Sequence, residues 1–170
     1  TLEVLPKLGN VTVPYIYDAK EGFKEVPWPK LGTYEVGGGV RSNVMDLMKY
    51  AAVYIREGMV GNTQLVSEKG LRRMWQPVYQ ISRNGWYCSA LRLTQNYSGV
   101  TLVEHSGDQP GVASNFGFVP EKGMAAAVLT NVRGVPASAI WLAAINTALG
   151  LPIEQKRSIE TEISQIGRAS

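Results

Sequence analysis

Residues 103–132, VEHSGDQPGVASNFGFVPEKGMAAAVLTNV, decide the fold class of this chain. Three apolar, strand-forming runs meet in or at this stretch, over residues 100–105, 114–119 and 124–130. The links between them are short and contain Gly and Pro. Such links join antiparallel strands, because parallel strands need a crossover of a dozen or more residues. The sequence therefore predicts an antiparallel meander.

Helical patterns flank this meander on both sides. Ser42 is a good N-cap for a helix that ends at Gly58, and Ser67 begins a shorter helix that stops before Pro77. A further strand is expected over residues 86–93, and an apolar helix over residues 136–149 ends at Gly150. We therefore predict an α+β fold, an antiparallel sheet flanked by helices.

The chain divides into three parts on these patterns. Residues 1–41 form an irregular loop region with a short hairpin, since prolines and glycines break any regular element after it. Residues 42–150 carry the sheet and its helices. Residues 151–170 are predicted to be a helical tail, on the spacing of Ile159, Ile163 and Ile166.

The composition excludes several classes of protein. The chain has 170 residues, 45% of them hydrophobic, and a net charge of +3 carried by scattered Lys and Arg residues. Nucleic-acid binding is therefore not expected, and no apolar run approaches the roughly 18 residues of a membrane span. One cysteine, Cys88, and one histidine, His105, cannot make a disulfide framework or a four-ligand zinc site. We expect no metal and no cofactor.

The lone histidine stands at the predicted end of a strand, followed by Ser106 and Gly107. Side chains at positions 105 and 107 share one face of the strand, and Ser106 points the other way. A glycine there lets a ligand approach the backbone, whose free N–H groups can bind an added strand or a developing oxyanion. Asp108 is the nearest acid–base candidate for His105. The alternative is a structural histidine, which is the commoner case for a lone histidine in a strand.

These segments resemble the C-terminal half of the serine β-lactamase-like superfamily, in particular class C β-lactamases, penicillin-binding proteins, D-aminopeptidases and related esterases. That family carries a Lys-Thr-Gly or His-Thr/Ser-Gly triplet on an inner strand beside the active site, and His105-Ser106-Gly107 matches it. The resemblance spans roughly residues 30–150. It also includes Gly38-Gly39-Val40-Arg41-Ser42, Gly85-Trp86, Gln109-Pro110-Gly111, Glu121-Lys122-Gly123 and Leu129-Thr130-Asn131.

The other two motifs of that family are missing from this sequence. No serine has a lysine three positions on, and no tyrosine has an asparagine two positions on. The resemblance therefore implies a C-terminal fragment of a serine hydrolase, whose acyl-serine forms on a Ser-x-x-Lys motif outside this chain. It implies catalytic roles for His105, in place of the triplet lysine, and for Asp108, whose N–H matches an oxyanion donor. Ser106 and Gly107 would bind substrate.

The resemblance also implies partners and a compartment. The expected partners are the N-terminal half of the same protein, with Ser-x-x-Lys and Tyr-x-Asn, and a small acyl or peptide-like substrate. An uncovered apolar sheet face around residues 125–129 would favour self-association. A periplasmic or extracellular location is expected from the family. Two alternatives stay open: a non-catalytic relative that binds peptide-like or cell-wall ligands, and an interaction module whose sheet pairs with a partner strand.

Overall fold

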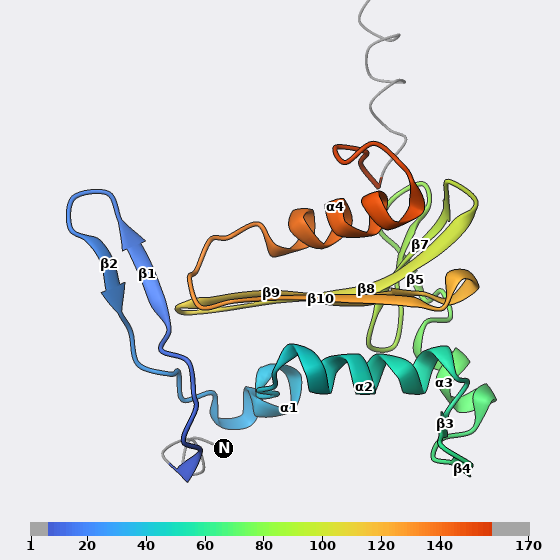
Figure 1. Cartoon of the computed structure of the whole chain (residues 1–170), viewed down its shortest axis with the longest axis horizontal. Coiled ribbons are helices and arrows are strands. Elements are labelled where there is room, and N and C mark those ends of the chain that lie inside the picture. The colour runs from blue at the N-terminus through green and yellow to red at the C-terminus, as the bar shows by residue number, and fades with distance from the viewer. Residues whose placement is uncertain (1–6, 158–170) are drawn as a thin grey trace, which may run out of the picture.

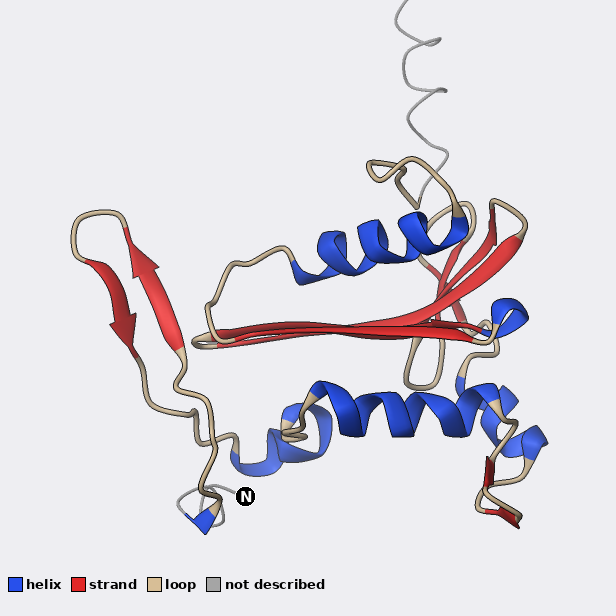
Figure 2. Ribbon diagram, viewed as in Figure 1, coloured by secondary structure: helices blue, strands red, loops and turns tan. Residues whose placement is uncertain are grey.

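The computed structural model describes residues 7–157, which form a sheet with helices on both faces (Figures 1 and 2). Helix α4 (Ala137–Leu149) lies along one face, and α2 (Val44–Ile55) lies along the other. Helix α3 (Glu68–Met74) follows α2 on the same side of the sheet. The predicted α+β class, an antiparallel sheet flanked by helices, is confirmed.

The sheet has six antiparallel strands in the order β10-β9-β8-β7-β6-β5, so neighbours in the sequence are neighbours in space. The strands are β5 (Tyr79–Gln80), β6 (Gly85–Tyr87), β7 (Arg92–Tyr97), β8 (Val100–Gln109), β9 (Val112–Val119) and β10 (Met124–Thr130). One predicted strand, residues 86–93, is wrong. The chain turns at residues 88–91, where the Cys88 N–H donates to the Leu91 carbonyl, and β6 and β7 pair across this turn.

Strand β8 continues four residues beyond the predicted end at His105. Gln109 pairs with Val112, so Pro110 and Gly111 alone form the turn into β9. Gly111 has a φ of +83°, a conformation that L side chains rarely adopt. The sequence Ser-Gly-Asp-Gln has low strand propensity and resembles a loop, but this tight turn extends the ladder through it. His105 therefore lies in mid-strand.

The helix ends follow local capping. The side chain of Asn43 accepts from the Asp46 N–H and that of Ser67 accepts from the Gly70 N–H, so these residues are the N-caps of α2 and α3. The predicted cap at Ser42 is thus wrong by one residue. Gly150 ends α4 with a φ of +71°, as expected.

Two apolar clusters fill the spaces between the sheet and its helices. The α4 cluster of buried side chains consists of Tyr97, Val100, Leu102, Val119, Trp141, Leu142 and Ile145. The α2 cluster consists of Tyr54, Leu71, Cys88, Leu91, Leu93, Val103 and Phe118. Successive residues of β8 and β9 alternate between the two clusters, as the two-residue period of a strand requires.

Residues 7–41 contain several short elements. The hairpin β1 (Tyr15–Asp18) and β2 (Gly22–Glu25) is present, and a 3-10 turn, η2 (Gly32–Tyr34), leads into a single helical turn, α1 (Glu35–Gly38). The small hairpin of β3 (Met59–Val60) and β4 (Thr63–Gln64) follows α2, and the 3-10 turn η3 (Pro120–Lys122) joins β9 to β10. Residues 151–157 are not helical, and the predicted helix around Ile159, Ile163 and Ile166 lies outside the described residues.

The expected uncovered sheet face around residues 125–129 is not found. Helices α2 and α4 cover the two faces of β10, and its residues are half-buried except Leu129. The outer edge of β10, unlike its faces, is uncovered. Strand β10 is the last strand of the sheet, and no other strand among residues 7–157 pairs with this edge between Met124 and Thr130. No helix in this range has the length and hydropathy to cross a membrane.

Candidate active site on strand β8

The triplet His105-Ser106-Gly107 lies where β8 loses one of its two neighbours. Arg92 opposite Glu104 is the last pair between β7 and β8, whereas β9 continues to pair with β8 as far as Gln109. Residues 105–109 therefore have an open edge on the β7 side within the described part of the chain. We call this edge, from His105 to Gln109, the open edge.

The direction of the backbone groups along this edge follows from the ladder. Both the N–H and the carbonyl of Ala113 bond to the Thr130 hydroxyl, on the β10 side of β9. Asp108 is opposite Ala113, so this is a pair that exchanges no backbone hydrogen bonds. The N–H and C=O groups of Asp108, and of Ser106 two residues before it, therefore point to the open edge. An extended ligand could bind there as an added strand.

Both nitrogens of the His105 ring have partners. Nδ1 lies 2.7 Å from the carbonyl oxygen of Ser106, and Nε2 lies 2.9 Å from the hydroxyl of Tyr87 on β6. The two rings meet edge to face, with centroids 5.9 Å apart at 82°. His105 is half-buried and Asp108 is exposed. The partner of His105 is thus Tyr87, and the sequence did not show it because the two residues are 18 positions apart.

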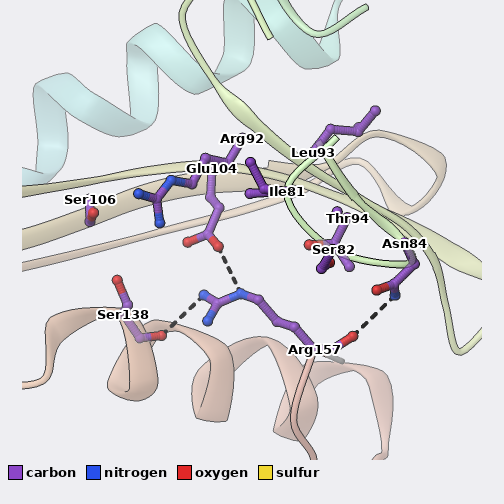
Figure 3. A pocket seen from close by; sticks show the side chains of 11 residues that line it. Ile81, Ser82, Asn84, Arg92, Leu93, Thr94, Glu104, Ser106, Ser138 and Arg157 are labelled. Carbon is purple, nitrogen blue, oxygen red and sulfur yellow. Dashed lines mark hydrogen bonds and ion pairs between the residues drawn. The ribbon is translucent and has the colours of Figure 1, made fainter. Parts of the chain in front are cut away.

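Ser106 and Gly107 differ in their surroundings. Ser106 points toward α4 and lines two neighbouring cavities of about 160 and 200 Å³, which also share Ser138 at the start of that helix (Figure 3). His105 lines neither of these two cavities. Gly107 is exposed, and a Cβ added to it would lie only 2.6 Å from the Ser114 hydroxyl. A side chain at this position would therefore crowd Ser114 on β9.

A buried polar network lies beside Ser106 on the α4 side. Glu104 is 6% exposed, and its Oε1 lies 2.7 Å from Nε of Arg157. Its Oε2 accepts a hydrogen bond of 2.7 Å from Asn115, whose own oxygen accepts from Ser138. Arg157, the last residue that the structure describes, also donates to the Ser138 carbonyl, and Figure 3 shows its side chain between α4 and the sheet. Glu104 is thus fully paired and serves the structure.

The described residues contain no serine that is hydrogen-bonded to an activating lysine or histidine. None of the serine hydroxyls in residues 7–157 is hydrogen-bonded to a lysine or a histidine side chain. Burial raises the pKa of the Cys88 thiol, which favours its neutral, unreactive form. Over the same range there is no cluster of three or more His, Cys, Asp and Glu residues that could hold a metal ion. The arrangement is suited to gripping a substrate at the open edge.

Comparison with solved structures supports the fold. The chain is similar to an octameric penicillin-binding protein homologue from Pyrococcus abyssi, with 28% identity and a TM-score of 0.75, over 92% of this chain and 35% of that one. A D-stereospecific amidohydrolase from Streptomyces sp. shares 20% identity and a TM-score of 0.55, over 74% and 36% of the two chains. The D-amino acid amidase from Ochrobactrum anthropi SV3 shares 22% identity and a TM-score of 0.54, over 71% and 34%.

The chain thus spans about a third of the length of these structures. None of the curated proteins compared with it matches. The family model described as Beta-lactamase matches residues 8–149, which include the sheet, the open edge and the four helices of the described residues. The chain belongs to the beta-lactamase family.

Proposed function

We propose that this chain is the substrate-side, sheet-bearing part of a serine hydrolase that cleaves an ester, lactam or peptide bond. The observation that carries the proposal is the open edge, which presents His105, Ser106 and the Asp108 N–H beside one another on one strand. The acyl-serine would form on a Ser-x-x-Lys motif outside this chain. The absence of that motif from the sequence and the partial coverage of the solved structures support this division.

In the proposed mechanism the substrate lies along the open edge of β8. The Asp108 N–H donates to the oxyanion that develops on the substrate carbonyl, as one of two donors. His105 exchanges a proton with the catalytic groups of the upstream segment, or orients the polar end of the substrate. Ser106 binds the substrate from the α4 side, and Gly107 leaves room for it. The Asp108 carboxylate turns toward solvent, consistent with its exposure.

The partner in this proposal is the upstream segment of the same protein. The outer edge of β10 offers it a row of unpaired backbone groups on an apolar strand, an edge that proteins rarely leave exposed. A strand from that segment would extend the sheet beyond β10. A chain produced without this segment would instead pair with a second copy at the same edge, which is the self-association that we expect of it alone.

The test is reconstitution. The chain alone should show no turnover of p-nitrophenyl acetate or of a chromogenic lactam, and co-expression with its upstream segment should restore hydrolysis of at least one of them. His105→Ala in the reconstituted pair should lower the rate. Stoichiometric labelling of the chain alone by a fluorophosphonate would contradict the proposal. Binding of acyl-peptides by the pair without any turnover would favour the non-catalytic alternative.

A matched pair of substitutions tests the oxyanion role. Asp108→Pro removes both the carboxylate and the N–H that points to the open edge, at a position where proline is tolerated in a strand. It should lower kcat of the reconstituted pair by about 10²–10³, the cost of one lost oxyanion donor. Asp108→Ala keeps that N–H and should leave kcat near its starting value. Equal losses in both variants would show that the carboxylate, and not the N–H, matters.

A further inference from the structure

The contact between Tyr87 and His105 is not used in the proposed mechanism. Tyr87 reaches His105 from two strands away because β7 begins only at Arg92 and leaves the open edge clear. Its hydroxyl lies 2.9 Å from Nε2 of the imidazole. With 38% of its surface exposed, Tyr87 is not a core residue placed there by packing alone.

The other ring nitrogen decides which way the hydrogen bonds run. A backbone carbonyl only accepts, so Nδ1, at 2.7 Å from the Ser106 carbonyl, must carry a proton. In the neutral imidazole Nε2 is then the acceptor, and the Tyr87 hydroxyl donates to it. The two contacts together select one neutral tautomer, with the proton on Nδ1.

The tyrosine ring is itself held in place. The guanidinium carbon of Arg92 lies 6.0 Å from the centroid of the Tyr87 ring, at the distance of a cation–π contact. Arg92 is opposite both Tyr87 on β6 and Glu104 on β8, so the sheet fixes its position. Arg92 and the edge-to-face packing on His105 thus restrict the orientation of the phenol ring.

We propose that Tyr87 is a positioning residue that acts through His105, by donating its hydroxyl proton to Nε2 and so holding the imidazole in the Nδ1–H tautomer. A substrate or upstream donor that displaces the Tyr87 hydroxyl from Nε2 would then meet a hydrogen-bond acceptor of fixed orientation. The role of this tautomer in hydrolysis rests on the proposed function. The tautomer itself does not, and it is measured separately.

The single histidine of the chain allows a direct test. Long-range ¹H–¹⁵N correlation spectra of the ¹⁵N-labelled chain, alone and paired with its unlabelled upstream segment, report the protonation of each ring nitrogen. We expect a protonated Nδ1 and an unprotonated Nε2 at neutral imidazole. In Tyr87→Phe the Nε2 shift should move and the Nε2–H tautomer should become populated, because the ring loses the donor that holds its lone pair.

The control is Tyr34→Phe, at an exposed tyrosine on η2, which should leave the ring spectrum unchanged. The backbone amide spectra of both variants should match the parent away from the substitution, which shows that the fold is retained. An Nε2 shift and tautomer population in Tyr87→Phe identical to those of the parent would overturn the proposal.

Kinetics of the reconstituted pair give the second readout. Tyr87→Phe should lower kcat by about tenfold with KM little changed, less than the roughly 10²–10⁴-fold cost of a lost acid–base group. Ring spectra that respond to Tyr87→Phe in a pair without hydrolysis would refute the proposed function and keep the positioning role. An unchanged kcat in an active pair would overturn the link between this tautomer and catalysis.

Discussion

Neighbouring residues of β8 face two different environments. Glu104 points under α4, is 6% exposed, and is held by Arg157 and Asn115. His105 points to the α2 side, is half-buried, and bonds only to Tyr87 and to the backbone at Ser106. The difference lies in the number of partners and in the access to solvent. The residue with the stronger charge network is the structural one, and the residue at the open edge is the functional candidate.

The comparison shows why charge alone does not identify the site. A buried ion pair stabilises its own two partners, and removing only one of them leaves an uncompensated buried charge. The open edge is the opposite case, because its backbone groups at Ser106 and Asp108 have no strand partner in the described residues. Backbone groups without a strand partner, more than charged side chains, distinguish this candidate site.

The largest expected loss of stability comes from breaking the buried ion pair on the α4 side. Glu104→Ala removes the carboxylate and leaves Arg157 and Asn115 without their partner beneath the helix. Breaking a buried ion pair from one side costs about 3–5 kcal/mol, so we expect a loss of that order in the free energy of unfolding. Urea denaturation followed by circular dichroism measures it. If the free energy of unfolding falls by less than about 1 kcal/mol, the network around Glu104 contributes no more than an exposed ion pair does.

A matched ion pair serves as control. Glu57 and Arg72 lie 2.7 Å apart, the same distance as in the buried pair, but both side chains are more than half exposed. Glu57→Ala should cost at most about 1 kcal/mol, because exposed pairs contribute little. The two ion pairs have the same N–O distance, so a larger loss of stability in Glu104→Ala than in Glu57→Ala is the effect of burial.

Much of the fold could be predicted because its signals are local. The strand Met124–Thr130 has its predicted bounds, and α4 begins one residue after the proline that indicates its start. Ser67 caps α3 as expected. Errors arose where tertiary pairing overrides propensity. The tight turn at Gly111 extends β8 through a sequence that resembles a loop, and the turn at residues 88–91 splits a strand that the sequence shows as continuous.

The candidate site was predictable only in part. The triplet from His105 to Gly107 stands out in the sequence, as does Asp108 after it. Tyr87 does not, since its contact with His105 depends on where β7 begins. The pairing of Glu104 with Arg157 joins residues 53 positions apart through a segment that we expected to be helical. Contacts of this kind depend on the assembled sheet, which no local pattern contains.

The second prediction tests how closely α4 packs on the sheet. A Cβ added to Gly117 on β9 would lie 2.6 Å from the Val103 carbonyl and 2.7 Å from the Trp141 ring. Gly117→Ala should therefore cost about 1–3 kcal/mol, the usual range for overpacking, as measured by thermal or urea unfolding. Gly107→Ala is the control at the open edge, where the added carbon meets only the rotatable hydroxyl of Ser114. Equal losses of stability in Gly117→Ala and Gly107→Ala would show that the backbone is packed no more closely under α4 than at the open edge.

The smallest expected effect is on the pH dependence of stability, through Tyr54 in the α2 cluster. Burial, followed by the hydrogen bond with Tyr50, raises the pKa of the Tyr54 hydroxyl well above its usual range. A raised pKa means that the folded state holds this proton more tightly than the unfolded state does. The stability it contributes is therefore complete below the ordinary tyrosine value of about 10 and is lost as the pH rises above it.

Tyr54→Phe should flatten this alkaline loss and cost about 0.5–1.5 kcal/mol at neutral pH, for the hydrogen bond to Tyr50. Some loss should persist in the variant, because burial also raises the pKa of Tyr97 in the α4 cluster. Urea denaturation at pH 8 and at pH 10.5–11.5 measures both terms, since ionisation of the unfolded tyrosines begins near pH 10. If the slope of stability with pH is the same in Tyr54→Phe as in the parent, the alkaline sensitivity belongs to the α4 cluster and not to the α2 cluster.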